Sequence, residues 1–541
     1  MTLEQARTLV DVLAVRARQD PAGVFFELFD EPTTYGSLWT LARRYGASLA
    51  AGGVGRGDRV AILLPTCKEF FATFFGIMSL GAIPVPLYPT FGPAELASIF
   101  AHADPRAAVT IGWFESTVRG AQASAPSLAR ILDPAELDRP AAEPVWPALD
   151  GEETAFLQYT SGSTGQPKGV DLPHRSVLAN IRAFIEAVQA RPGEPVVSWL
   201  PLYHDMGLIG LGLGTLYAGC HLYLLPPDLR NPRQWLELVT RTRARITASP
   251  DFGYRNCLRN VHDLSGLDLG SLRIAFSGAE PIRPDTMRQF EARFGLERVM
   301  VPAYGLAEAT LAVTLGDLQA PIRVDPSGRF VGVGRPIPGV AVAISEEAGR
   351  RLPPGETGEI VVRTPSAMRG YYRDPGATAH ALRSGWLHTG DLGYLDADGY
   401  LFVVGRQKDL IIVRGENLMP IDVEKVVDAV PGVRYSAAVG VTSERLGTQR
   451  LVVVAEVRQP DVAAGEASRL VRRIVSAVHE IRGFRPSRVL LVRPGTIPKT
   501  TSGKIQHPRL AELVGEARLG DAVIYPQRGA ERAGAGSPAD A

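Results

Sequence analysis

Cysteine is scarce in this chain of 541 residues, which contains only Cys67, Cys220 and Cys257, far apart from one another. These residues form neither a C-x-x-C pair nor a zinc-ligand spacing. The sequence therefore predicts no disulfide framework and a reducing, cytoplasmic compartment.

An excess of charge of one sign is also missing, because 58 basic residues face 57 acidic ones and leave a net charge of +1. We therefore expect no general attraction to nucleic acid or to an acidic membrane, and partners must be recognised locally.

Long apolar runs are absent as well. The best candidate for a membrane span, residues 70–85, is interrupted by Gly81 and Pro84, so we expect no transmembrane helix. The first residues carry charges such as Glu4 and Arg7 in place of a continuous apolar stretch, which predicts no signal peptide. The class that remains is a soluble, multi-domain enzyme or binding protein.

Short apolar segments alternate with helical stretches through the first part of the chain. This alternation predicts an α/β architecture in which helices cover mostly parallel sheets. The helix expected after the first of these segments covers residues 68–80 and is closed by Gly81. We predict strands at 60–64, 83–85, 107–111, 156–159, 196–200, 221–225, 245–248 and 274–276.

The pattern changes near residue 340. Short strands separated by turns rich in glycine and proline predict an antiparallel, barrel-like subdomain at about 335–407. After it, strands and two helices at 421–430 and 467–482 predict a compact α+β domain. The predicted organisation is thus an N-terminal domain over 1–407, a mobile C-terminal domain over 408–527, and a disordered tail over 528–541 that consists of small and charged residues.

A loop rich in hydroxyl groups and glycine is the strongest local signal. Residues 159–169 read Tyr-Thr-Ser-Gly-Ser-Thr-Gly-Gln-Pro-Lys-Gly and follow a short apolar strand. Glycine lets successive backbone amides converge on an anion, while hydroxyls and a lysine add further donors. The spacing is not that of a Walker A loop, and the alternative is a flexible surface turn. Because the segment lies between a strand and an apparent helix, we predict a phosphate-binding loop comprising Thr160, Ser161, Gly162, Ser163, Thr164, Gly165 and Lys168.

This loop resembles the phosphate loop of the adenylate-forming superfamily, which includes acyl-CoA synthetases, adenylation domains of peptide synthetases, and luciferases. Further segments resemble other signatures of that superfamily and occur in the same order across nearly the whole chain. They are an adenine-side turn at 277–280, an aromatic-plus-carboxylate motif at 304–308, a ribose-binding motif at 389–391, a hinge at 405–409 and a catalytic-lysine motif at 498–504.

The resemblance implies a role for each matching residue. Tyr304 offers a flat face to adenine, and Asp391 can accept hydrogen bonds from both ribose hydroxyls. Glu308 is a carboxylate suited to Mg²⁺, which shares phosphate oxygens with one or two protein carboxylates. Lys504 is the implied catalytic lysine, with Thr160, His204 and Glu308 as further catalytic residues, and Lys408 is the implied hinge. The implied ATP-binding residues are those of the phosphate loop together with Ser277, Gly278, Ala279, Glu280, Tyr304, Gly305, Asp391 and Arg406.

Two segments point to one branch of the superfamily. Residues 199–210 (Trp-Leu-Pro-Leu-Tyr-His-Asp-Met-Gly-Leu-Ile-Gly) and 304–314 are similar to the corresponding stretches of fatty acyl-AMP ligases, which pass the acyl group to the phosphopantetheine of a carrier protein. The chain thus resembles most the branch of fatty acyl-AMP ligases and fatty acyl-CoA synthetases, and these two segments favour a carrier protein as acceptor. The first segment and the region around 247–253 should form the acyl pocket. Its apolar side chains suggest an apolar acid. The predicted pocket residues are Trp199, His204, Met206, Gly207 and Phe252.

The implied activity is a two-step ligation in which a carboxylic acid reacts with ATP to give acyl-AMP and pyrophosphate, and a pantetheine thiol then displaces AMP. The ligases usually carry an insertion that blocks free coenzyme A, but only about 20 residues separate Thr314 from Val333 here. The segment 414–420 mixes features of both branches. We therefore expect acyl-CoA as product, with ATP, Mg²⁺ and coenzyme A required.

Two alternatives remain from the sequence. One is loading of the phosphopantetheine of an acyl carrier protein, for which Arg469, Arg472 and Arg473 on one predicted helix could supply a basic patch. The other is a catalytically silent nucleotide-binding regulator. The presence of both Lys504 and Glu308 argues against that regulator.

Overall fold

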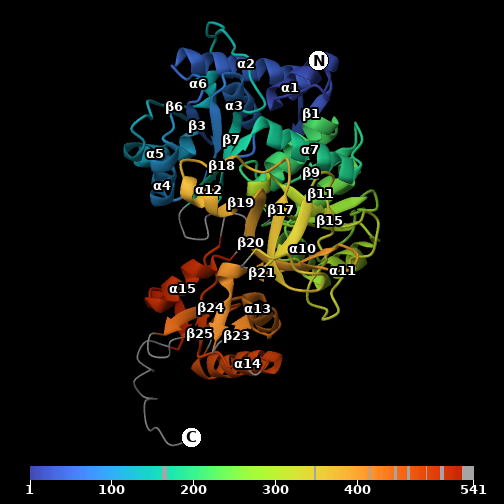
Figure 1. The fold of residues 1–541 in the computed structure, drawn as a ribbon, viewed down its shortest axis with the longest axis vertical. Coiled ribbons are helices and arrows are strands. Elements are labelled where there is room, and N and C mark those ends of the chain that lie inside the picture. Colours follow the sequence, from blue (N-terminus) through green and yellow to red (C-terminus); the bar gives the residue numbers. More distant parts are fainter. Residues whose placement is uncertain are drawn as a thin grey trace, which may run out of the picture. The chain divides into compact units, whose positions relative to one another are not determined.

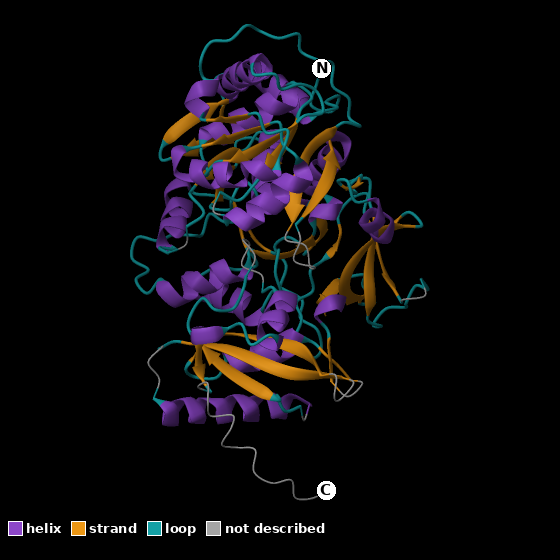
Figure 2. Ribbon diagram, turned by 90° about the vertical axis from the view of Figure 1, so that its left-hand side faces the viewer, coloured by secondary structure: helices purple, strands orange, loops and turns teal. Residues whose placement is uncertain are grey.

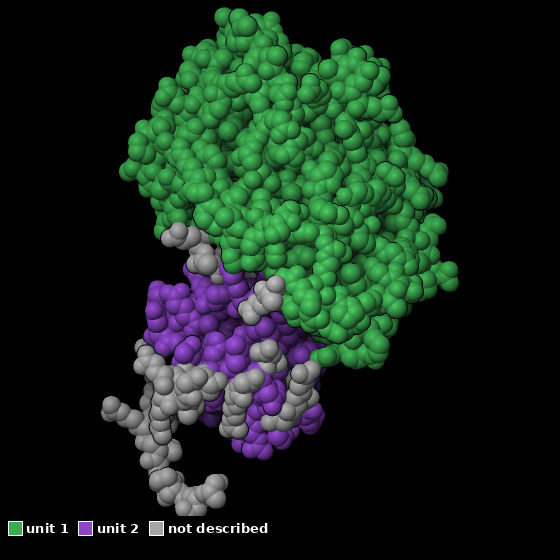
Figure 3. All heavy atoms as spheres, in the orientation of Figure 1, with its two compact units in different colours: residues 1–161, 166–389, 393–403 green, residues 162–165, 390–392, 404–541 purple. Residues whose placement is uncertain are grey.

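The computed structural model describes residues 1–89, 91–160, 167–228, 230–346, 349–413, 416–443, 448–459, 463–482, 484–499 and 505–526. These residues form two compact units (Figure 3). The described residues within 1–161, 166–389 and 393–403 belong to unit 1, and those within 390–392 and 404–541 belong to unit 2. The predicted domain boundary at 407/408 stays a prediction, and the predicted tail at 528–541 lies outside the described residues.

The largest sheet of unit 1 has nine strands in the order β15-β14-β13-β12-β11-β9-β10-β1-β2. The run from β13 to β1 is parallel, and β2, β14 and β15 are antiparallel to their neighbours. All residues of β11 and β12 are buried, as expected for strands covered on both faces. The strands are β1 (Val24–Leu28), β2 (Glu31–Thr34), β9 (Pro195–Ser198), β10 (His221–Leu224), β11 (Ile246–Ser249), β12 (Ile274–Ser277), β13 (Met300–Gly305), β14 (Ala312–Leu315) and β15 (Arg335–Pro336).

A second, wholly parallel sheet has the order β4-β3-β5-β6. Its strands are β3 (Arg59–Leu63), β4 (Ile83–Pro86), β5 (Ala107–Thr110) and β6 (Arg130–Leu132). The helix between β3 and β4, α3 (Lys68–Ser79), is buried continuously from Phe70 to Ser79. A helix that is apolar all round belongs in the interior, and α3 accordingly contributes four phenylalanines to the main core of unit 1.

Helices accompany both sheets (Figure 1), as the alternating sequence predicts. The predicted α/β fold class and the strands expected in the first part of the chain are confirmed. The remaining helices of unit 1 are α1 (Leu9–Gln19), α2 (Tyr35–Ala51), α4 (Pro93–Ala103), α5 (Gly112–Ala121), α6 (Pro134–Leu137), α7 (His174–Val188), α8 (Gly214–Ala218), α9 (Arg233–Thr242), α10 (Asp251–Asn260), α11 (Pro284–Phe294) and α12 (Pro375–Ala381). Short 3-10 turns are η1 (Gln122–Ser124) and η3 (Ala307–Ala309), and η2 (Met206–Leu213) is a π-helix.

A three-stranded antiparallel sheet corrects one prediction. It has the order β18-β8-β7, with β7 (Thr154–Thr160), β8 (Lys168–Pro173) and β18 (Gly370–Tyr371). The predicted phosphate loop thus joins two strands of a hairpin. The expectation that a helix follows it directly is wrong, because α7 begins only at His174. Val170 and Leu172 are buried while Asp171 between them is not, which is the alternation of a strand.

The other strands expected near 335–407 form a five-stranded sheet with the path β16-β17-β20-β19 and with β21 beside β20. The pairs β16–β17 and β19–β20 are antiparallel, as predicted. The strands are β16 (Ala341–Ser345), β17 (Gly358–Arg363), β19 (Leu382–Arg383), β20 (Trp386–Leu395) and β21 (Leu401–Arg406).

Unit 2 has its own α+β core. Its four-stranded sheet has the order β24-β25-β26-β27, and α14 lies along one side of it (Figure 2). Leu470, Ile474 and Val478 of α14 pack into a cluster with Val453 of the sheet. The elements are η4 (Gln407–Asp409), β22 (Ile411–Val413), β23 (Glu416–Leu418), α13 (Pro420–Asp428), β24 (Val433–Ser443), β25 (Thr448–Val457), α14 (Ala464–Arg482), β26 (Arg488–Val492), α15 (His507–Gly515), η5 (Gly520–Ala522) and β27 (Val523–Tyr525).

Among the described residues, no helix combines the length and the apolar character that crossing a bilayer requires.

Candidate nucleotide and acyl site

The predicted phosphate loop is held by the β7–β8 hairpin, in which Thr160 lies opposite Lys168. Ser161, Gly162, Ser163, Thr164 and Gly165 lie outside the described residues. The stem is closely packed, because a Cβ atom on Gly169 would come within 3.1 Å of the Tyr159 ring. The Tyr159 hydroxyl lies 2.7 Å from Nδ1 of His102, so the last turn of α4 supports the strand that leads into the loop.

The predicted adenine-side turn follows β12 directly. Ser277 is fully buried at the end of that strand, and a Cβ on Gly278 would lie 3.0 Å from the carbonyl oxygen of Ala303. Ala279 has a positive φ of 65°. The Glu280 Oε1 atom accepts a hydrogen bond of 2.5 Å from the backbone N–H of Phe252. The turn is therefore joined to the segment that we predict to line the acyl pocket.

Tyr304 and Gly305 end the neighbouring strand, β13. A Cβ on Gly305 would lie only 1.8 Å from the carbonyl oxygen of Leu311, so the close approach of β14 requires glycine at this position. Because β12 and β13 are parallel neighbours, the adenine-side turn and this aromatic residue leave the sheet at the same edge. Ligands of open α/β sheets bind at the carboxyl ends of the strands.

Glu308 lies in η3, and the turn after it is strained and firmly clamped. Thr310 has φ of 74°, which is unusual for a β-branched residue. The buried Asn180 of α7 donates from Nδ2 to the carbonyl oxygens of Ala309 (3.3 Å) and Ala312 (2.9 Å), and its Oδ1 accepts from the Ala312 amide (3.1 Å). Backbone strain of this kind persists only where the surroundings over-determine it.

A hydrogen bond from another side chain orients the carboxylate of Glu308. Its Oε1 accepts a 2.7 Å hydrogen bond from the hydroxyl of Tyr371. Among the described residues, no group of three or more His, Cys, Asp or Glu side chains could hold a metal ion. A cation at Glu308 would therefore have at most two such protein ligands from the described residues and would take the others from phosphate oxygens and water. That is the usual arrangement for Mg²⁺ at nucleotides, so the residues present fit this ion.

The predicted acyl segment follows β9 and thus leaves the same sheet edge. It turns sharply, because a Cβ on Gly207 would lie 2.2 Å from the carbonyl oxygen of Pro201. It then continues as the π-helix η2, a rare element that is frequent at functional sites. His204 is partly exposed, and its Nδ1 lies 2.7 Å from Oδ1 of Asp205. Asp205, which the sequence did not single out, is therefore a direct neighbour of the ring nitrogen.

Aromatic rings of the two segments predicted to form the acyl pocket pack against each other. Trp199 is 5% exposed, and Phe252 meets it edge-on with ring centroids 5.8 Å apart. Met206 and Phe252 are partly buried hydrophobic residues that pack against the main core. Asp251, next to Phe252, is fully buried with Arg255 Nε 2.8 Å from its Oδ2. Burial raises the pKa of Asp251, while the Arg255 charge opposes this rise.

Within unit 2, the two residues predicted to bind the ribose side of ATP are paired with each other. Arg406 Nε donates to Asp391 Oδ1 over 2.8 Å. The Asp391 side chain is 8% exposed and that of Arg406 is 48% exposed. The pair holds the carboxylate of Asp391 in one orientation and leaves much of the guanidinium group in contact with solvent.

The predicted hinge residue, Lys408, lies in η4, and its neighbour Asp409 belongs to a buried charge cluster. Nε2 of His507 lies 2.7 Å from Oε1 of Glu424, and its Nδ1 lies 3.5 Å from Oδ2 of Asp409. Burial disfavours the charged imidazole, but the Glu424 and Asp409 carboxylates outweigh it and raise the pKa of His507 to about 10. The imidazolium ion therefore links η4, α13 and α15. Lys504 lies outside the described residues.

This cluster predicts a pH-dependent stability. The folded-state pKa of His507, about 10, lies above its ordinary value of 6.5. The stabilisation it contributes is therefore fully present below pH 6.5 and is lost as the pH rises toward 10. We expect His507→Gln to destabilise unit 2 by about 3 kcal/mol at pH 6 and by much less near pH 10. Hydrogen exchange of α13 and α15 in the full chain measures this difference, and a pH-independent difference would contradict the charged cluster.

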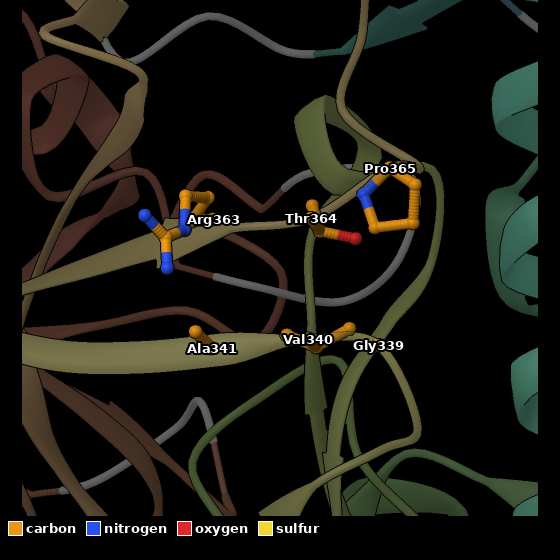
Figure 4. Close-up of a pocket in the computed structure, with 6 residues that line it drawn as sticks. All are labelled: Gly339, Val340, Ala341, Arg363, Thr364 and Pro365. Atoms are coloured by element: carbon orange, nitrogen blue, oxygen red, sulfur yellow. The ribbon is translucent and has the colours of Figure 1, made fainter.

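One hollow of unit 1 contains none of the predicted site residues (Figure 4). It has a volume of about 490 Å³ and is lined by Gly339, Val340, Ala341, Arg363, Thr364 and Pro365, at the ends of β16 and β17. The Arg363 guanidinium lies 5.1 Å from the centroid of the Trp386 ring. The hollow offers one charged group, and that group is already stacked on an aromatic ring.

The chain is similar to known proteins over most of its length. The profile of the family described as AMP-binding enzyme matches residues 13–372. The long-chain-fatty-acid–AMP ligase FadD26 of Mycobacterium marinum is 33% identical, with 94% of this chain and 97% of the relative covered. The medium-chain-fatty-acid–[acyl-carrier-protein] ligase JamA of Moorena producens is 32% identical, with 94% and 95% covered. The putative fatty-acid–CoA ligase FadD21 of Mycobacterium tuberculosis is 32% identical, with 84% and 87% covered.

Solved structures show the same fold. A structure from studies of fatty acyl-adenylate ligases of E. coli and L. pneumophila superposes with a TM-score of 0.88 at 30% identity. The superposition covers 96% of this chain and 99% of that chain.

Proposed function

Because the chain belongs to the AMP-binding enzyme family, we propose that it activates a fatty or similarly apolar carboxylic acid as acyl-AMP and transfers the acyl group to a pantetheine thiol. In the first step a carboxylate oxygen attacks the α-phosphorus of ATP, and the bond to the β-phosphate breaks with release of pyrophosphate. In the second step the thiol attacks the acyl carbon, and AMP leaves with the oxygen that joined it to the acid.

One observation carries this proposal. The adenine-side turn after β12, the aromatic-plus-carboxylate motif after β13 and the acyl segment after β9 all leave the nine-stranded sheet at the carboxyl ends of its parallel strands. Nucleotide and acid would therefore meet at one edge. Glu280 joins the nucleotide and acyl segments there through its hydrogen bond to Phe252.

Different residues of the chain would bind the phosphates, the reacting carboxylate and the acyl chain. Thr160 and Lys168, at the two ends of the phosphate loop, would donate to phosphate oxygens, and His204 would close over the reacting carboxylate. Mg²⁺, when bound at Glu308, would neutralise charge on the phosphates. Lys504 would stabilise charge that develops on the α-phosphoryl group, where preorganised donors have their largest effect. Trp199 and Phe252 would contact the acyl chain.

For the acceptor, we propose free coenzyme A, with an acyl carrier protein as the second candidate. The three relatives have nearly equal identity, yet their names state an AMP ligase, a carrier-protein ligase and a CoA ligase. The connection from β14 to β15 supports coenzyme A. Its described residues contain two isolated bridges, Val324–Val331 and Gly332–Phe402, and no inserted subdomain. The enzyme would act in the cytoplasm, where a reducing environment keeps its three cysteines as free thiols.

The test is acid-dependent exchange of labelled pyrophosphate into ATP, with fatty acids of increasing length, followed by equal concentrations of coenzyme A and a cognate holo-carrier. We expect exchange with apolar acids and formation of acyl-CoA. Exclusive acyl-carrier product even at high coenzyme A would overturn the acceptor assignment. A nucleotide-binding regulator would bind ATP but support no exchange with any acid.

The carrier-protein alternative makes a separate prediction about the basic surface of α14. Arg469, Arg472 and Arg473 are all exposed on this helix. If an acidic carrier docks there, replacing all three by glutamate should lower kcat/KM for the holo-carrier about tenfold, and the loss should shrink at high salt. Transfer to free coenzyme A by the same variant is the internal control and should not change. An equal loss with both acceptors would show that the patch does not recognise a carrier.

A further inference from the structure

Tyr371 touches two predicted site residues that lie far apart in the sequence. Its hydroxyl donates to Glu308 Oε1 over 2.7 Å. The ammonium group of Lys168 lies 4.5 Å from the centroid of its ring. One side chain thus contacts both the carboxylate proposed to hold Mg²⁺ and the lysine proposed to bind phosphate.

The backbone fixes Tyr371 in this position. Strand β18 pairs with β8, so that Tyr371 lies opposite Val170, two residues from Lys168. On the other side, the amide of Met368 donates to the carbonyl oxygen of Glu308 over 2.8 Å. The Tyr371 amide donates to Oγ1 of Thr378 over 2.9 Å. The segment 368–371 therefore joins the η3 turn to the phosphate-loop hairpin.

The two contacts differ in their electrostatic consequences. A ring face attracts an ammonium ion without neutralising it, so Lys168 keeps its full charge for a phosphate. The hydroxyl occupies one carboxylate oxygen of Glu308 and leaves the other to a cation. Among the described residues, Lys168 forms no ion pair with an acidic side chain. Each of the two charged groups thus has its own contact with Tyr371, the carboxylate with the hydroxyl and the ammonium group with the ring.

We propose that Tyr371 is a positioning residue for adenylation. It orients Glu308 toward the metal through its hydroxyl and holds Lys168 toward the phosphates through its ring. This inference rests on the proposed function and deepens it, because it couples the metal site to the phosphate loop through a residue outside the family's motifs named above.

The test separates the hydroxyl from the ring. Tyr371→Phe removes the hydrogen bond and keeps the ring, so the Mg²⁺ concentration for half-maximal pyrophosphate exchange should rise roughly tenfold, with little change in the KM of ATP at saturating Mg²⁺. Tyr371→Leu removes both contacts and should raise the KM of ATP about threefold to tenfold in addition. Tyr372→Phe is the matched control, since its ring packs edge-on against His102, and it should match wild type.

A second readout does not depend on turnover. Calorimetric titration of each variant with a non-hydrolysable ATP analogue, with and without Mg²⁺, should show that Tyr371→Phe loses most of the affinity gained from Mg²⁺. If Tyr371→Phe keeps the wild-type Mg²⁺ response in both measurements, the proposal is wrong. A uniform fall in kcat with unchanged Mg²⁺ and ATP dependence would make the residue merely structural, which also overturns it.

Failure of the proposal for Tyr371 can be distinguished from failure of the proposed ligase function. If wild type shows no acid-dependent exchange, the ligase activity itself is refuted. If Glu308→Gln leaves the Mg²⁺ dependence unchanged, the metal assignment fails, and the proposal for Tyr371 fails with it.

Discussion

Replacing Lys504 by alanine should slow acyl-AMP formation by a factor of at least about 10²–10³. Transfer from supplied acyl-AMP to the thiol should stay within a few-fold of wild type. The reason is that the ammonium group would contact the reacting phosphoryl and carboxylate groups only in the adenylating arrangement. Rapid-quench measurement of the two half-reactions separates these effects.

Lys425→Ala is a suitable control for this variant, because it removes another lysine of unit 2, on α13, that has no proposed role. Its two half-reactions should both run at wild-type rates. Equal losses in both half-reactions of Lys504→Ala would indicate that the lysine is structural.

The second large effect is expected at Lys408. Proline at this position fixes φ near about −65° and disfavours helical geometry at the preceding residue, Gln407, where η4 begins. If unit 2 must rotate about Lys408 between the two steps, Lys408→Pro traps one arrangement. We expect thioester formation to fall by at least about 10²-fold while adenylation survives better. Single-turnover rates of each step measure the difference.

The matched variant Lys408→Ala distinguishes the backbone from the side chain. It removes the long cation but leaves φ and ψ free, so both steps should proceed nearly normally. If Lys408→Pro also runs both steps at wild-type rates, the hinge lies elsewhere or no rotation is needed.

Local patterns in the sequence predicted much of the fold. Strand β3, for example, contains the continuous apolar run Val60–Leu63, and a buried parallel strand has this pattern whatever surrounds it. The glycines and hydroxyls of residues 159–169 predicted a phosphate-binding loop, and that role stays a prediction. Strand β8 after it was not predicted, because it has only six residues and the helical pattern of α7 begins directly after it at His174.

The contacts that orient the site were not predictable from local patterns. Tyr371 reaches Glu308 across 63 positions of the chain, and Asn180 reaches Ala312 across 132. A tyrosine near a glycine, or an asparagine within a helix, carries no local signal of such a partner. Only the pairing of β18 with β8 brings Tyr371 to Lys168. Asp205 could have been noticed, since it adjoins His204 in sequence, and an acid next to a histidine is a pair that can fix the orientation of the ring.

The same limit applies to His507. Its sequence neighbours are uncharged except for Arg509, and its two carboxylate partners come from η4 and α13. The raised pKa of this histidine arises from tertiary structure alone.

The central claim is that the carboxylate of the acid attacks the α-phosphorus of ATP. The most direct test supplies a fatty acid labelled with ¹⁸O in its carboxylate, together with ATP, Mg²⁺ and coenzyme A, and analyses the nucleotide product by mass spectrometry. Attack at the α-phosphorus followed by transfer to the thiol predicts AMP that carries one ¹⁸O atom, with unlabelled pyrophosphate. Unlabelled AMP, or ADP with labelled orthophosphate, would contradict the account.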